Sequence, residues 1–87
     1  MEPSVLERVV RVVRPYVRRT DVLKVTEDAL LDDDLDINSA RLIDLALALE
    51  DEFLITIKDD DIGNLKSIGD IVDYVKRTGK IVPDSTR

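Results

Sequence analysis

The chain has 87 residues, of which 44% are hydrophobic and 37% are charged, as is typical of one small helical domain. It contains no cysteine and no histidine, which excludes disulfides, thiolate nucleophiles and the commonest general base and metal ligand. Its 13 basic and 19 acidic residues give a net charge of −6, so we expect basic protein partners rather than nucleic acid or an anionic membrane. No apolar run reaches the roughly 18 residues of a membrane span, and nothing at the start resembles a signal peptide, so we expect a cytoplasmic protein.

The charge is distributed unevenly along the chain. Residues 1–24 contain six basic and three acidic residues, a balance of +3, whereas residues 25–64 contain two basic and thirteen acidic residues, a balance of −11. No repeat or low-complexity linker separates the acidic block from the rest. We therefore expect it to belong to the domain itself.

The first predicted helix covers about residues 4–18. Its apolar residues recur at steps of three and four, as on one face of a helix: Leu6, Val9, Val10, Val13 and Val17. Ser4 and Glu7 have the spacing of a capping box, which favours a helix start there. Pro15 should kink or end the helix because it lacks an amide proton and crowds the carbonyl of Arg11.

A long connection follows, from about Thr20 to Ile37. We predict that its apolar residues anchor it on the core: Val22, Leu23, Val25, Leu30 and Leu31. The aspartates from Asp32 to Asp36 begin like a calcium-binding EF-hand loop, but Ile37 stands where that loop needs glycine and Ile43 where it needs glutamate. A register that starts at Asp34 fails in the same way. Loose binding of divalent cations to an acidic loop is the alternative interpretation.

The strongest helical pattern covers residues 38–53. Its main apolar stripe consists of Leu42, Leu45, Ala46, Leu49 and Phe53, and Ile43 and Leu47 widen it. Asn38 or Ser39 can cap its start. A helix this apolar should be the central element of the core.

The remaining elements are shorter. Residues 54–57 alternate like a strand but have no partner strand in the chain, so we expect an extended connector. A short helix is predicted near residues 59–65. The last helix, about residues 67–77, starts with the capping-box pair Ser67 and Asp70 and buries one apolar face, while Gly79 offers a stop: Ile68, Ile71, Val72 and Val75. Residues 81–87 should be a disordered tail.

Conventional catalysis has little support in this sequence. Without histidine, a serine nucleophile would need a lysine or carboxylate base in a deep pocket, which so small a chain can hardly provide. Physical reasoning alone explains Ser39 as a helix N-cap. Its surroundings point further, because acidic residues precede it and the helix that it opens carries Asp44, Glu50, Asp51 and Glu52.

The stretch from Asp34 to Phe53 resembles the signature of the acyl carrier protein family, in which a serine opens the second helix and an Ala-Leu-Glu-acid-Glu-Phe run closes it. Residues 57–61 resemble the turn that precedes the family's third helix, and residues 67–75 resemble its fourth helix. The resemblance covers nearly the whole chain. It implies a small all-α four-helix bundle over residues 1–80, with three main helices, one short helix and a long loop between the first two.

In that family a phosphopantetheinyl transferase attaches 4′-phosphopantetheine to the serine, and the thiol of this arm carries acyl groups as thioesters. By this resemblance Ser39 is the attachment site, and the protein is a non-catalytic monomeric carrier of acyl or aminoacyl groups. The resemblance assigns Asp44, Glu50 and Asp51 to the surface that contacts basic partner enzymes. It also implies a set of residues that line the acyl cavity, although each could equally be core packing: Leu47, Leu49, Ile57, Ile62, Leu65, Ile71 and Tyr74.

Four positions near Ser39 depart from the family pattern. Asn38 and Ala40 replace an aspartate and a leucine, Asp36 replaces a glycine, and Arg41 replaces an acidic residue. Arg41 can pair with Asp44 and should disfavour partners that recognise an all-acidic helix. These departures favour a specialised carrier for lipid or secondary-metabolite biosynthesis, served by its own ligase and by synthase or acyltransferase enzymes. The alternative is an interaction module that is never modified, in which Ser39 is only a cap.

Overall fold

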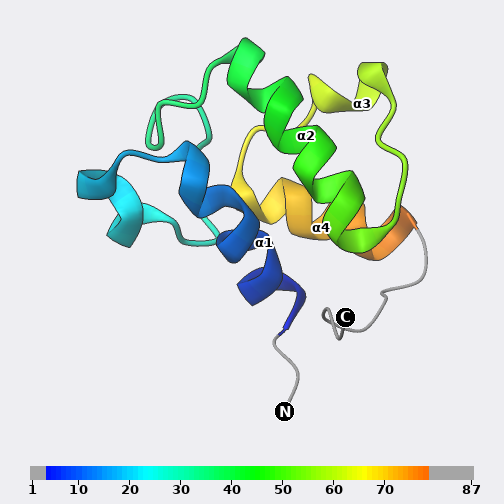
Figure 1. Ribbon diagram of the computed structural model, residues 1–87, viewed down its shortest axis with the longest axis horizontal. Coiled ribbons are helices and arrows are strands. Elements are labelled where there is room, and N and C mark those ends of the chain that lie inside the picture. Colours follow the sequence, from blue (N-terminus) through cyan, green and yellow to red (C-terminus); the bar gives the residue numbers. More distant parts are fainter. Residues whose placement is uncertain (1–3, 79–87) are drawn as a thin grey trace.

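The computed structural model describes residues 4–78, and within them the chain is helical (Figure 1). The α-helices are α1 (Val5–Val13), α2 (Ser39–Phe53), α3 (Asp59–Ile62) and α4 (Ile68–Thr78), and the 3₁₀ helices η1 (Arg14–Tyr16) and η2 (Arg19–Lys24) follow α1. In this part of the chain, the only β-type pairing is an isolated antiparallel bridge between Leu30 and Ser67. The predicted all-α fold, with three main helices, a short one and a long loop, is confirmed.

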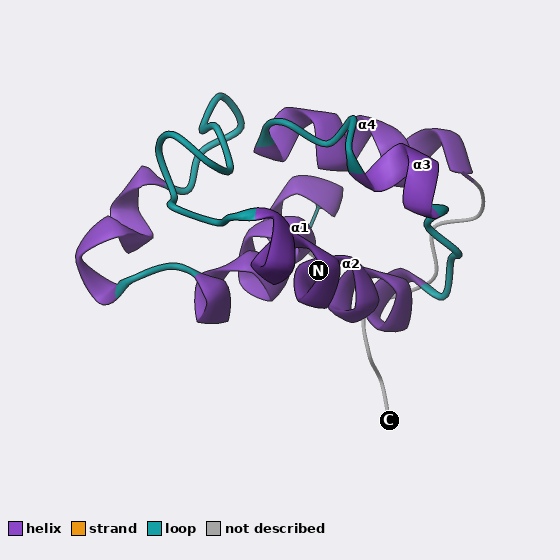
Figure 2. Ribbon diagram, turned by 90° about the horizontal axis from the view of Figure 1, so that it is seen from above, coloured by secondary structure: helices purple, strands orange, loops and turns teal. Residues whose placement is uncertain are grey.

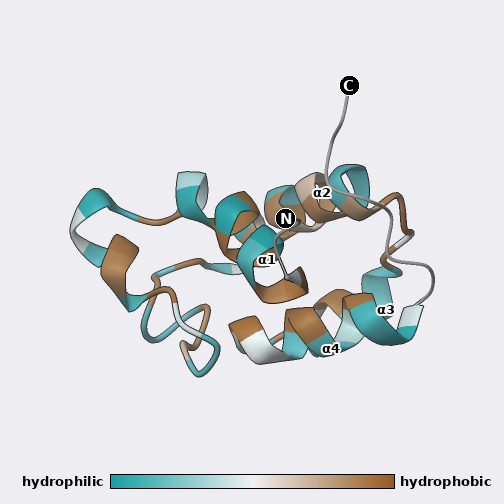
Figure 3. Cartoon of the chain, turned by 90° about the horizontal axis from the view of Figure 1, so that it is seen from below, coloured by the Kyte–Doolittle hydropathy of each residue, from teal (hydrophilic) through white to brown (hydrophobic). Residues whose placement is uncertain are grey.

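The core lies between α1, α2 and α4. Viewed from above, α1 and α2 lie beside each other, and α3 and α4 lie together on one side of this pair (Figure 2). The apolar sides of α1, α2 and α4 face one another across this space (Figure 3). The side chains that fill it are almost completely buried: Val9, Val13, Leu45, Leu49, Phe53, Ile68, Ile71 and Val75. The predicted stripes of α1 and α4 therefore face the core as expected.

The start of α1 and the effect of Pro15 were predicted correctly, but the helix is shorter than residues 4–18. The Glu7 amide donates to Ser4 Oγ at 3.1 Å and the Ser4 amide donates to Glu7 Oε1 at 2.9 Å, which completes the capping box. The helix ends at Val13 rather than near residue 18, and the chain tightens into η1 around Pro15. The proline causes this ending, because it cannot donate the next helical hydrogen bond.

The long loop between α1 and α2 is fastened to the start of α4. The Ile68 amide donates to the Ala29 carbonyl at 3.1 Å, and the Gly69 amide donates to the Glu27 carbonyl at 2.8 Å. A Cβ atom on Gly69 would lie 3.2 Å from the Glu27 carbonyl oxygen, so this close approach favours glycine. These backbone contacts place the acidic loop beside the α3–α4 connection.

The predicted anchors of this loop were only partly right. Val25 and Leu31 are buried and Val22 is half-buried, but Leu23 is 94% exposed and Leu30 is 40% exposed. Leu23 points outward because residues 19–24 form the unpredicted η2, whose buried residue is Asp21. That carboxylate pairs at 3.3 Å with both Arg18 and Lys24, each three residues away, so local ion pairs rather than apolar burial brace this turn.

The core-facing side of α2 is narrower than predicted. Leu45, Ala46, Leu49 and Phe53 are buried, but Ile43 is 53% exposed. Only one side of the helix packs against α1 and α4, and position 43 lies on the other side. The helix ends at Phe53, and the residue that caps it, Leu54, has a left-handed φ of 55°.

The elements after α2 largely follow the prediction. Residues 55–58 form an extended connector without strand pairing, as expected. The predicted short helix is shorter than residues 59–65 because it ends at Ile62. The Asp70 amide donates to Ser67 Oγ at 3.1 Å and the Ser67 amide donates to Asp70 Oδ2 at 3.2 Å, which confirms the second capping box. The predicted stop at Gly79 and the tail of residues 81–87 lie outside the described residues.

Candidate functional site

Ser39 is the first residue of α2, and its side chain is not the helix cap. The preceding residue, Asn38, has extended backbone angles, and its Oδ1 accepts the Arg41 amide at 3.0 Å. Of the two caps that the sequence allowed, Asn38 is therefore the one used, and the interpretation of Ser39 as the cap is wrong. Ser39 is exposed, and its hydroxyl makes no hydrogen bond with any residue from 4 to 78. The hydroxyl is thus available for chemistry.

A hollow of about 210 Å³ opens beside Ser39. The loop, the first turn of α2 and the α3–α4 connection together form its walls. The other residues that line it are Leu31, Asp32, Ile37, Leu42, Gly63, Leu65 and Lys66. Of these, the resemblance had suggested only Leu65, although Ile37 and Leu42 are apolar neighbours of Ser39 in the sequence and could have been suspected. Four of the lining residues are apolar side chains, and the lining also includes one cationic residue and one carboxylate.

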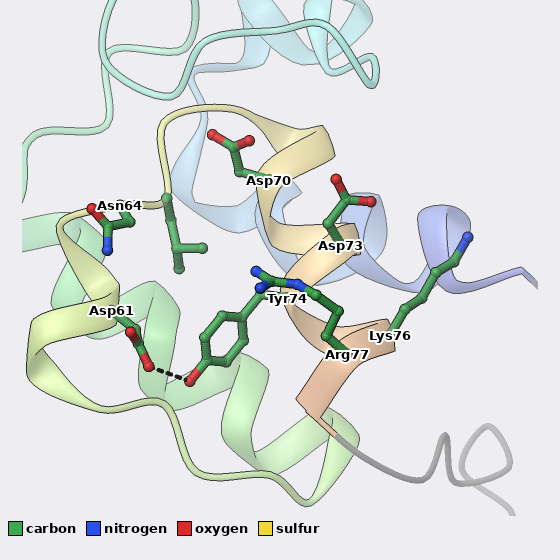
Figure 4. A pocket seen from close by; sticks show the side chains of 8 residues that line it. Asp61, Asn64, Asp70, Asp73, Tyr74, Lys76 and Arg77 are labelled. Atoms are coloured by element: carbon green, nitrogen blue, oxygen red, sulfur yellow. Dashed lines mark hydrogen bonds between the residues drawn. The ribbon is translucent and has the colours of Figure 1, made fainter.

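A second hollow, of about 460 Å³, lies between α3 and α4 (Figure 4). Tyr74 points across it from α4, and its hydroxyl donates to Asp61 Oδ2 on α3 at 2.9 Å. Burial, reinforced by this hydrogen bond to Asp61, raises the pKa of Tyr74 above its usual value. Leu65 lines both hollows, but the other residues around the second one are mostly charged or polar.

The structure brings six of the seven predicted acyl-cavity residues into one region. Four are buried and two are half-buried against the same core: Leu49, Ile57, Leu65 and Ile71, then Ile62 and Tyr74. It does not bring Leu47 to them. That side chain is 60% exposed, because position 47 lies one turn beyond Ile43 on the outer side of α2.

The residues predicted to contact partners differ in how freely they face solvent. Asp44 and Asp51 are exposed on α2. Glu50 is half-buried, and its Oε2 accepts the Ile57 amide at 2.7 Å, so it also fastens the connector after the helix.

The sequence suggested that Arg41 could pair with Asp44, but the structure shows another partner. Its Nη1 donates to the Tyr16 carbonyl oxygen at 3.1 Å, while the Tyr16 hydroxyl donates to the Asp44 carbonyl oxygen at 3.4 Å. The carbonyl oxygen of Tyr16, the last residue of η1, therefore binds this guanidinium in place of Asp44. Sequence reasoning missed Tyr16 because the contact joins residues 25 apart along the chain.

Two negative observations apply to residues 4–78. No group of three or more acidic residues is arranged to hold a metal ion, and none of the helices described is long and apolar enough to cross a membrane.

Residues 7–75 match the family model described as "Phosphopantetheine attachment site". An acyl carrier protein of Exiguobacterium sibiricum is 43% identical over 53 residues, which cover 61% of this chain and 67% of that protein. A putative mitochondrial acyl carrier protein of Schizosaccharomyces pombe is 31% identical over 75 residues, which cover 86% of this chain and 67% of that protein. The chain spans between 51% and 67% of the length of the first relatives that it matches.

The fold agrees with these matches. A solved structure of the acyl carrier protein from Enterococcus faecalis superimposes with a TM-score of 0.71 at 29% identity, covering 86% of this chain and 94% of that one. The chain belongs to the acyl carrier protein family, whose prosthetic group is phosphopantetheine. The residues present suit this group, because the exposed hydroxyl of Ser39 lies beside a hollow at the start of a helix.

Proposed function

We propose that Ser39 is the attachment site of 4′-phosphopantetheine and that the chain carries acyl or aminoacyl groups. The observation that supports this most directly is that Asn38 caps α2, which leaves the exposed Ser39 hydroxyl without a structural task. When attached, the group supplies a thiol that holds its cargo as a thioester. The chain itself contributes no catalytic group in this proposal, and the carrier domain comprises residues 1–80.

The start of α2 suits an attached phosphodiester. The first amides of a helix point out of its N-terminal end, and the helix dipole makes this end favourable for an anion. The side-chain cap uses only the Arg41 amide. Ser39 therefore presents its hydroxyl where a phosphate is stabilised after attachment.

The hollow beside Ser39 offers the cargo a way toward the core, because its lining also includes Leu65, which is buried against the core. The larger hollow between α3 and α4 is lined mainly by charged and polar residues and is not part of this route. In this proposal a bound acyl chain displaces Leu65 and lies among the buried residues Leu49, Ile57 and Ile71 and the half-buried Ile62. A Leu65→Phe substitution should then shorten the longest acyl chain that shifts the amide resonances of Ile71, and unchanged shifts for every chain length would contradict this route.

The outer side of α2 is the proposed docking surface. Asp44 and Asp51 supply exposed carboxylates, and the exposed side chains of Ile43 and Leu47 add apolar area beside them. Such a mixed surface suits basic enzymes that must hold the carrier briefly. The partners proposed are a phosphopantetheinyl transferase, a loading ligase, and synthase or acyltransferase enzymes, which a monomeric carrier visits in turn.

We further propose a specialised pathway, in lipid or secondary-metabolite biosynthesis in the cytoplasm. Arg41 supports this, because it places a positive charge at the docking surface two residues from Ser39. A relative of Mycolicibacterium aurum that is 32% identical over 62 residues is a meromycolate extension acyl carrier protein, so one similar protein serves an unusual lipid.

Intact-mass measurement after incubation with coenzyme A and a phosphopantetheinyl transferase tests the attachment. The wild type should gain one phosphopantetheine and Ser39→Ala should gain none. A chain that gains no mass with any of several transferases would support the unmodified interaction module instead. Attachment that persists in Ser39→Ala, at Ser67 for example, would show that the proposed residue is wrong.

A further inference from the structure

Lys66 lines the hollow that Ser39 opens onto, and its backbone is firmly held. Its carbonyl oxygen accepts the Leu31 amide at 2.9 Å, and its own amide donates to Asp70 Oδ2 at 3.0 Å. The first bond joins it to the loop and the second to the first turn of α4. The side chain therefore projects from a fixed point on the wall of the hollow.

The Lys66 ammonium forms no ion pair with any residue between 4 and 78. It is the one cationic residue among those that line this hollow. Arg41 lies two residues after Ser39 in the sequence, but its guanidinium already donates to the Tyr16 carbonyl oxygen. Lys66 is thus the cation placed to meet an anion at Ser39.

An anion attached at Ser39 would otherwise meet an unfavourable environment. Asp32 lines the same hollow, and three further aspartates follow before Ser39 in the loop: Asp33, Asp34 and Asp36. At low ionic strength such charges repel one another over about 10 Å or more. The first amides of α2 offset part of this repulsion, and a nearby ammonium offsets more.

We propose that Lys66 is a positioning residue that pairs with the phosphodiester of a group attached to Ser39. The pairing fixes the direction in which the arm leaves the serine, along the hollow toward Leu65. Asp32 opposes it by attracting the same ammonium. This inference rests on the proposed attachment at Ser39, but it can fail while that attachment holds.

The test compares the ³¹P chemical shift of the phosphodiester in four modified proteins: wild type, Lys66→Gln, Lys66→Arg and the matched control Lys58→Gln. Lys58 is an exposed lysine outside the hollow, before α3. The wild-type signal should shift between low salt and about 1 M salt, where the Debye length falls to roughly 3 Å. Lys66→Gln should lose most of this shift, whereas Lys66→Arg and Lys58→Gln should keep it.

A second measurement uses the melting temperature of the apo and modified forms. Lys66→Gln should make modification less stabilising than in the wild type, and Asp32→Asn should make it more stabilising. Circular dichroism of the apo variants checks that each is folded.

Two failures are distinguishable. Intact mass and peptide mapping show first whether Ser39 is modified, and absence of the group there would contradict the proposed function. If Ser39 is modified but the ³¹P signals of Lys66→Gln and wild type respond equally to salt, Lys66 does not hold the phosphodiester and the inference is overturned.

Discussion

At its C-terminal end α2 is held by a buried arginine, whereas at its N-terminal end it meets solvent through Ser39. Arg8 on α1 is only 2% exposed. Its Nε donates to Glu52 Oε2 at 2.9 Å and its Nη2 donates to the Glu52 carbonyl at 3.2 Å, while its guanidinium lies 4.6 Å from the centre of the Phe53 ring. A cation at a helix C-terminus is favourable, and so is an anion at the opposite end. Tertiary contacts thus fix one end of the helix, and the other end carries the proposed attachment site.

The largest effect on stability is expected at the C-terminal end of α2, which Arg8 anchors. Arg8→Ala should lower the free energy of unfolding by about 3 kcal/mol, because it leaves the partly buried Glu52 without its main partner. Arg11 also pairs with Glu52, at 3.3 Å, but its side chain is 52% exposed. Arg11→Ala should therefore cost less than about 1 kcal/mol. Urea unfolding of the two variants measures the difference, and equal losses would contradict the anchoring role of burial.

The next effect concerns the docking surface near the open end. Asp51→Lys should slow attachment by a general-purpose transferase roughly three- to tenfold at low salt, because it places a like charge before a basic partner. Arg41→Asp should increase the rate, although it also removes the hydrogen bond to Tyr16. Initial rates at low and high ionic strength test both variants. Equal rates for the variants and the wild type at low salt would mean that this face of α2 is not the docking surface.

At the N-terminal end of α2, capping and the proposed attachment should depend on different residues. Asn38→Ala should lower the free energy of unfolding by about 1 kcal/mol, because it removes the cap, and should leave Ser39 modifiable. Ser39→Ala should change stability far less and prevent attachment. Thermal unfolding and intact mass of the two variants give the comparison. A greater loss of stability in Ser39→Ala than in Asn38→Ala would reverse the assignment of the cap.

A smaller effect is expected at the residue that ends α2. Leu54 adopts a left-handed conformation and is 70% exposed. Leu54→Gly should stabilise the fold by about 0.5–1 kcal/mol, because the relief of backbone strain exceeds the added entropy of the unfolded chain. A matched change at exposed Ile43, which is helical, should instead destabilise it by about 1 kcal/mol. A loss of stability in Leu54→Gly would show that this side chain packs usefully despite its exposure.

The smallest effect depends on pH and lies in η2, away from both ends of α2. Lys24, by hydrogen bonding, and Arg18 hold the pKa of Asp21 below its ordinary value of 3.8. A lowered folded pKa stabilises the fold above the ordinary value, and this contribution is lost as the pH falls through the folded pKa. Stability should therefore decline below about pH 4, and Asp21→Asn should weaken that decline. Thermal unfolding of the wild type and of Asp21→Asn between about pH 3 and 6 tests this prediction. An equal loss of stability in the two proteins would mean that Asp21 has no such role.

Local signals were sufficient where neighbours along the chain decide the structure. Both capping boxes involve residues three apart, so Ser4–Glu7 and Ser67–Asp70 could be predicted from spacing alone. The ending of α1 before residue 18 was likewise indicated by Pro15. Asp36 stands where the family pattern has glycine. Its φ of 57° lies in the left-handed region, which glycine adopts without strain.

Other features depended on residues far apart along the chain. The amphipathic pattern of α2 could not show that Ile43 and Leu47 face solvent, because all apolar residues of a strongly apolar helix resemble core residues until its packing partners are known. Nor could it show that Tyr16 would take the Arg41 guanidinium, or that Arg8 would be buried against Phe53.

The sequence by itself determined the all-α class, the helix carrying Ser39 and the family, because periodicity, caps and a nearly ungapped motif are all local properties. The cap of α2 is local too, because Asn38 and Arg41 are three residues apart, but only the tertiary structure decided what surrounds Ser39. The hollow exists because the loop hydrogen bonds to the α3–α4 connection and brings Leu31 and Lys66 to the first turn of α2. Such contacts join positions tens of residues apart, and no local preference of the chain specifies them.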